Sequence, residues 1–113
     1  MRNIYSFIDL IQERPGMYIG DKSLRKLETL LWGYCTCLGM NEIKEEYEGR
    51  FFDPRDFSDW LYEEFEWSGA RGFAISIEEN TADADAAWDR FFELLQAFRF
   101  GGATDAFALP RPQ

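Results

Sequence analysis

Residues 81–98 read TADADAAWDRFFELLQAF, and this stretch decides the fold class that we predict for the 113-residue chain. Its large apolar residues recur at the spacing of one face of an α-helix. They are Trp88, Phe91, Phe92, Leu95 and Phe98. Thr81 is placed to cap the helix, and Asp83 and Asp85 fall in its first turn, where the helix dipole favours anions. With two glycines to end it at 101 and 102, the stretch predicts a long helix that packs one aromatic face against a core.

Three further segments carry the same helical signature. Each combines an apolar face at helical spacing with a residue suited to the N-cap position. They are residues 4–14 after Asn3, residues 24–38 after Ser23, and residues 54–65 after Asp53. Pro15 ends the first helix because proline disfavours helical geometry in the residue before it. Gly39 is a natural stop for the second, and Pro54 favours the start of the third.

The remaining segments are less regular. Pro15-Gly16 predicts a tight turn, after which residues 17–19 (Met-Tyr-Ile) fill the gap between two helices. Residues 40–52 are charged and predict a loop. The side chains of residues 73–77 alternate in the pattern of a β-strand. Because a lone strand would have no partner elsewhere in the chain, we expect a helix or irregular structure there. Residues 103–113 hold Phe107 and Leu109 among small residues and prolines, a pattern compatible with packing or fraying.

Length and composition limit the architecture further. A chain of 113 residues makes one domain, spanning 1–113. Hydrophobic residues make up 46% of the chain and aromatic residues 18%, and large rings fill a small core efficiently. We therefore predict an all-α fold, a compact bundle of four to five helices around an aromatic-rich core.

The charge of the chain is strongly negative and unevenly distributed. There are 21 acidic residues against 12 basic ones, a net charge of -9. Residues 41–66 carry most of the excess, with ten acids against three bases. Such a surface repels phosphate backbones, which disfavours direct binding of nucleic acid, and it attracts a basic partner.

Six carboxylates in this middle segment are the candidate partner-binding residues. They are Glu45, Glu46, Glu48, Asp56, Asp59 and Glu63. Four aromatic residues beside them are candidate anchors for the same partner, namely Tyr47, Phe51, Phe52 and Tyr62. The alternative interpretation is a solvated face that keeps an aromatic-rich protein soluble.

The residue inventory argues against catalysis. The chain has no histidine, which removes the commonest general base and the commonest metal ligand. Cys35 and Cys37 point to different faces of a helix, so they cannot easily bridge, and no other cysteine completes a metal site. We expect a protein that is not an enzyme, with no catalytic residue, no cofactor and no metal site. No apolar run approaches the ~20 residues of a membrane span and residues 1–12 lack signal-peptide features, so we expect a cytosolic protein without membrane contact.

The stretch Arg14-Pro-Gly-Met-Tyr-Ile-Gly20 resembles a segment near the start of the ATPase domain of the DNA gyrase B subunit and its relatives. There, a short helix also leads into such a run and then into another helix. In those ATPases the next helix carries a catalytic Glu and a magnesium-binding Asn. Here residues 24–38 hold Glu28, which comes too early, and no Asn; the Asp-x-Gly-x-Gly adenine motif is absent as well. We favour a structural role for the stretch, with a nucleotide-binding fragment as the alternative.

A second resemblance extends over nearly the whole chain. The order is a short helix, ERPGMYIG, a helix opening with SLRKLETLLWGY, an acidic FxxWLxxxF helix, and a final AWDRFFELLQAF helix. This order is similar to small acidic bacterial proteins encoded beside secreted toxins, the immunity proteins of contact-dependent or polymorphic toxin systems. The resemblance implies an all-helical cytosolic protein that binds and neutralises a cognate toxin domain, and it carries over no functional residues. A further alternative is an acidic nucleic-acid mimic or regulatory adaptor that binds several basic proteins.

Overall fold

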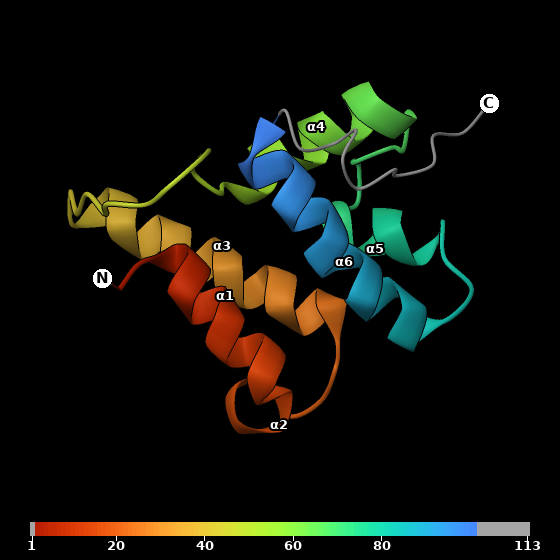
Figure 1. Cartoon of the computed structure of the whole chain (residues 1–113), viewed down its shortest axis with the longest axis horizontal. Coiled ribbons are helices and arrows are strands. Elements are labelled where there is room, and N and C mark those ends of the chain that lie inside the picture. Colours follow the sequence, from red (N-terminus) through yellow and green to blue (C-terminus); the bar gives the residue numbers. More distant parts are fainter. Residues whose placement is uncertain (1, 102–113) are drawn as a thin grey trace.

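The computed structural model describes residues 2–101, and every regular element in that range is a helix (Figure 1). The elements are α1 (Ile4–Glu13), α2 (Pro15–Tyr18), α3 (Leu24–Met40), α4 (Pro54–Phe65), α5 (Phe73–Glu78) and α6 (Ala84–Arg99). The predicted all-α bundle with an aromatic core is confirmed. Two of the six helices are short, and the shortest, α2, lies where a plain turn was predicted. The tail over residues 103–113 lies outside the described residues.

Of the four helices for which the sequence predicted a cap, three begin at the predicted residue and one does not. The Asn3 side chain accepts hydrogen bonds from the N–H groups of Tyr5 and Ser6, and the Ser6 hydroxyl returns a bond to the Asn3 backbone, a capping box. At the start of α4 the Asp53 side chain accepts hydrogen bonds from the N–H groups of Arg55 and Asp56. The exception is Thr81, whose predicted capping role at α6 is wrong. Asp83 takes that position and accepts from the N–H of Ala86, because the chain between α5 and α6 turns two residues later than the sequence suggested.

Thr81 instead belongs to the end of α5. Its hydroxyl donates to the carbonyl oxygen of Ile77 at 3.0 Å, so it closes the preceding helix and does not open the next one. The segment that alternates like a strand is α5 itself, which confirms the expectation of a helix or irregular structure over residues 73–77. Its residues Phe73, Ala74 and Ile77 are buried in the centre of the bundle.

The connection between α1 and α3 differs from its prediction. Residues 15–18 form one helical turn, and α3 continues through Gly39 to Met40. Met17 does not fill a gap between helices, because 67% of its side chain is exposed. Within this stretch it is Ile19 that packs against the core. The helical turn directs Met17 outward because successive side chains in a helix point about 100° apart.

The core is a cluster of aromatic rings gathered around Phe57. Its ring lies 5.2–5.7 Å from the rings of Phe52, Phe73, Phe91 and Phe98, measured between centroids. Most of these pairs are edge-to-face, the arrangement that the ring quadrupole favours. α3, α4, α5 and α6 meet at this cluster, and α1 crosses in front of α3 in Figure 1 with Ile4, Ile8 and Ile11 buried beneath it. Among the described helices none is long and apolar enough to span a membrane.

Candidate partner-binding surfaces

The segment between α3 and α4 carries three of the six predicted carboxylates and is fixed to the bundle by α6. The Arg99 guanidinium donates from Nε to the Glu48 carbonyl oxygen at 2.8 Å, and the backbone N–H of Arg50 donates to the Arg99 carbonyl oxygen at 2.7 Å. Arg99 also lies 4.0 Å above the Tyr5 ring, a cation–π contact. The Tyr5 hydroxyl donates to the Arg50 carbonyl oxygen. These contacts hold residues 48–50 in place although they form no helix.

The six carboxylates divide into two groups. Glu46, Glu48, Asp59 and Glu63 are exposed, and we call these four residues the acidic surface. None of the four forms an ion pair with another residue in the described part of the chain. Glu45 and Asp56 are less exposed and have internal partners.

Glu45 connects the segment to α1 and α3. Its Oε1 accepts from the buried N–H of Ile4 at 2.9 Å, and its Oε2 accepts from the Tyr34 hydroxyl. Burial and this carboxylate raise the pKa of Tyr34 above its ordinary value, so the phenol stays protonated as a donor. Next to it, the Glu46 carbonyl oxygen accepts from the Asn3 side-chain amide at 2.8 Å. Glu45 therefore has a structural function within the chain, independent of any partner.

Asp56 accepts two hydrogen bonds from the Arg50 guanidinium, one at each carboxylate oxygen. The two hydrogen bonds measure 2.8 and 3.1 Å, a bidentate geometry that places the end of the segment against the first turn of α4. Asp59 and Glu63 follow Asp56 at spacings of three and four residues, so the three carboxylates share one face of α4.

The four predicted aromatic anchors have different environments. Tyr62 is 58% exposed and Tyr47 is 38% exposed, so both are available to a partner. Phe51 is only partly exposed and packs against the core. Phe52 is fully buried in the aromatic cluster, and its prediction as an anchor is wrong. The loop turns Phe52 inward, where its ring packs against four rings of the core, those of Phe57, Phe73, Phe91 and Phe98.

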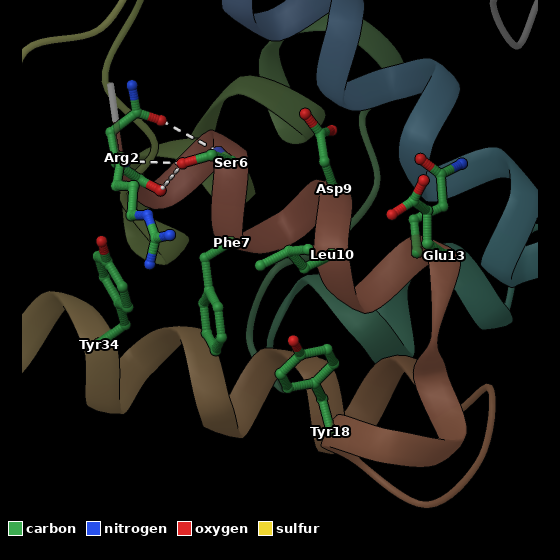
Figure 2. Close-up of a pocket in the computed structure, with 10 residues that line it drawn as sticks. Arg2, Ser6, Phe7, Asp9, Leu10, Glu13, Tyr18 and Tyr34 are labelled. Atoms are coloured by element: carbon green, nitrogen blue, oxygen red, sulfur yellow. Dashed lines mark hydrogen bonds between the residues drawn. The ribbon is translucent and has the colours of Figure 1, made fainter.

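A groove beside α1 is a surface that the sequence did not indicate. It has a volume of about 960 Å³ and lies between α1 and α3, with α2 at one end (Figure 2). Phe7 and Leu10 of α1, Tyr18 of α2 and Tyr34 of α3 provide its apolar wall. The only sequence signal was that Phe7 and Leu10 extend the apolar side of α1 beyond the buried face.

Two groups that could carry chemistry, the Glu28 carboxyl and the Cys35 thiol, are engaged in structure. Glu28 accepts from the N–H groups of Phe73 and Ala74 at 3.2 and 3.3 Å, at the start of α5, and burial raises its pKa. Burial also raises the pKa of Cys35 to about 11, which leaves little of the nucleophilic thiolate at neutral pH. Within residues 2–101 no group of three or more Cys, Asp or Glu residues is placed to hold a metal ion.

Comparison with known proteins adds no further constraint on these surfaces. No family model, curated protein or solved structure matches the chain. The function is therefore argued from the geometry and chemistry of the surfaces.

Proposed function

We propose that this protein is a stoichiometric inhibitor, an immunity protein that binds a basic toxin domain and blocks its active site or the surface around it. The proposal includes action in the cytosol and assigns no catalytic step to the chain. The observation that carries it is the exposure of the four carboxylates of the acidic surface and of two rings next to them in sequence, Tyr47 and Tyr62.

The electrostatics of this arrangement support rapid capture of a basic partner. Exposed carboxylates of one sign raise the association rate of an oppositely charged protein, and the effect weakens as salt screens it. A toxin that cleaves nucleic acid needs a basic cleft to hold phosphates, so an acidic surface can occupy the same cleft. Tyr47 and Tyr62 would add apolar contact area, which charge alone does not provide.

The internal contacts of two carboxylates, Glu45 and Asp56, support assigning the binding to four carboxylates instead of six. Glu45 bonds to Ile4 and Tyr34, and Asp56 bonds to Arg50. A partner would have to break these bonds to use either carboxylate fully, whereas the four residues of the acidic surface require no such exchange. The engagement of Glu28 at the start of α5 also gives that residue a structural function, which weighs against its use as the base of a nucleotide hydrolase.

The test is to purify the chain with the product of the adjacent reading frame and to measure its toxicity, its activity and its affinity for this protein. We expect a one-to-one complex, loss of toxin activity, and an affinity that falls as salt is raised. The double reversal Asp59→Lys/Glu63→Lys should slow association by about tenfold at low salt. The matched control is Asp21→Lys/Asp85→Lys, which changes the net charge equally at two exposed sites outside residues 41–66. Because Asp21 pairs with Lys26 and Asp85 lies in the first turn of α6, urea unfolding checks that both double variants stay folded.

Three outcomes would overturn the proposal. One is a neighbouring product that is harmless, or toxic and unaffected by this chain. Another is saturable binding of ATP and magnesium, which would favour the nucleotide-binding alternative. The third is equal binding of many unrelated basic proteins, which would indicate a general acidic adaptor.

A further inference from the structure

We propose that the groove between α1 and α3 receives an amphipathic helix of the toxin, with apolar side chains on one face and lysine or arginine along one edge. The inference rests on the proposed function and names the element of the partner that this second surface recognises. The chemistry of the groove follows from three observations on its wall, its rim and its length.

The wall of the groove is apolar, and its aromatic rings are held in place by one another. The Phe7 ring stacks on Tyr34 with centroids 5.4 Å apart and meets the edge of Tyr18 at 6.0 Å. Tyr34 is further fixed by its bond to Glu45. Leu10 is 44% exposed beside them, whereas the three isoleucines of α1 are fully buried. Such preformed apolar walls lose little conformational entropy on binding and act as hot spots.

The rim of the groove is negatively charged on the side that faces α6. Asp9 and Glu13 project from that edge of α1 in Figure 2, and Asp89 and Glu93 of α6 line the depression next to them. All four carboxylates are exposed, and Glu93 is paired with Arg90 at 3.1 Å. Among the described residues that line the groove, the one cation is Arg2, which lies beside Tyr34 at the opposite end (Figure 2).

Charge and shape together select the partner. A helix whose apolar residues recur at three and four positions fits a groove between two helices, and basic residues on its edge would meet Asp9 and Glu13. α1 has 10 residues, about 15 Å of helix, which matches three turns of a partner. A second copy of this chain is disfavoured, since its net charge of -9 would bring like charges together.

The groove also adjoins the acidic surface. Asn3 lines the Arg2 end of the groove and donates its amide to the Glu46 carbonyl oxygen at 2.8 Å. One partner can therefore cover Glu46 while its helix occupies the groove. The two surfaces would then contribute differently, with the carboxylates accelerating association and the groove slowing dissociation.

The test uses the product of the adjacent reading frame and the full chain. Leu10→Lys places a cation in the groove at an exposed helical position, and Met40→Lys is the matched control because Met40 is exposed at the far end of α3. Leu10→Gln is a second variant without the added charge. Circular dichroism and urea unfolding confirm that each variant is folded. We expect Leu10→Lys to weaken the complex at least thirtyfold, mainly through faster dissociation, and Met40→Lys to stay within twofold of the unmodified chain.

The outcomes separate this inference from the proposed function. An unmodified chain that fails to bind or neutralise the neighbouring product overturns both. A complex that forms normally and is unaffected by both substitutions at Leu10 overturns only the groove. A change in the oligomeric state of the free protein on Leu10→Lys, measured by light scattering, would mean that a second copy occupies the groove and would also overturn the inference.

Discussion

Replacing Glu45 by alanine should destabilise the fold, whereas replacing its neighbour Glu46 should not. Both residues are carboxylates of the segment between α3 and α4, and both precede the same aromatic residue, Tyr47. Only Glu45 directs its carboxylate inward, to the Ile4 N–H and the Tyr34 hydroxyl. The comparison therefore separates an internal hydrogen-bonded carboxylate from a solvated one at the same place in the chain.

The magnitude follows from the two bonds that are lost. Hydrogen bonds to a charged group contribute about 1.5–3 kcal/mol each, and leaving the buried Ile4 N–H without an acceptor adds to the cost. Because Glu45 is only partly buried, water recovers some of this loss. We expect Glu45→Ala to lower the free energy of unfolding by about 2–3 kcal/mol. For Glu46→Ala, an exposed substitution, we expect a change within about 0.5 kcal/mol.

The assay is urea unfolding followed by tryptophan fluorescence. With an m-value of about 1.5 kcal/mol per molar urea, the Glu45→Ala midpoint should fall by roughly 1.3–2 M. Tyr34→Phe removes one of the two bonds and should cost about 1 kcal/mol. In the double variant its effect should largely disappear, because the partner is already absent.

Equal midpoints for Glu45→Ala and Glu46→Ala would refute this reasoning. So would additive effects of Glu45→Ala and Tyr34→Phe, since independent contributions would mean that the two groups do not interact in solution.

Three further predictions concern a glycine, a thiol and a buried carboxyl. Gly72→Ala should destabilise the fold by more than about 1 kcal/mol, because Gly72 has a φ of +95° and a Cβ there would collide with the Glu28 carboxylate. The control Gly33→Ala lies in open space within α3 and should be neutral or stabilising by up to about 1 kcal/mol. Thermal unfolding measures both variants. At pH 8 a thiol reagent should modify only the exposed Cys37 quickly, since burial raises the pKa of Cys35 to about 11. Cys37→Ser should remove the fast phase of the reaction, and a fast phase that survives would contradict this prediction. Burial raises the pKa of Glu28, so the folded state binds its proton more tightly than the unfolded state. The stability of the unmodified chain relative to Glu28→Gln should therefore increase as pH falls from neutral toward the ordinary glutamate pKa, about 4.3. Urea titrations over that interval measure the difference, and a difference that stays flat or declines would contradict this prediction.

The helices were predictable because their signals are local. Asn3 and Asp53 precede apolar residues at helical spacing, and both cap the helix that follows them. A capping side chain reaches only two or three residues along the chain, so sequence order is sufficient to identify it. Thr81 shows the limit of this rule. Two residues suited to capping, Thr81 and Asp83, lie close together, and the packing of α5 and α6 selected the second.

The candidate surfaces were only partly predictable. Composition located the acidic segment, and four of the six predicted carboxylates are exposed there. It did not separate Glu45 from Glu46, because the partners of Glu45 are 11 and 41 residues away in sequence. The groove was missed for the same reason, since its wall combines Phe7, Tyr18 and Tyr34 from three helices.

The sequence by itself determined the helical class, the aromatic identity of the core and the negative charge of the middle segment, because spacing, residue type and charge are properties of neighbouring residues. Only the tertiary structure decided that Phe52 faces inward, that Glu45 bonds internally, and that α1 and α3 leave a groove between them. These features depend on how segments far apart in the chain pack together, and close packing allows each side chain only the space that its distant neighbours leave.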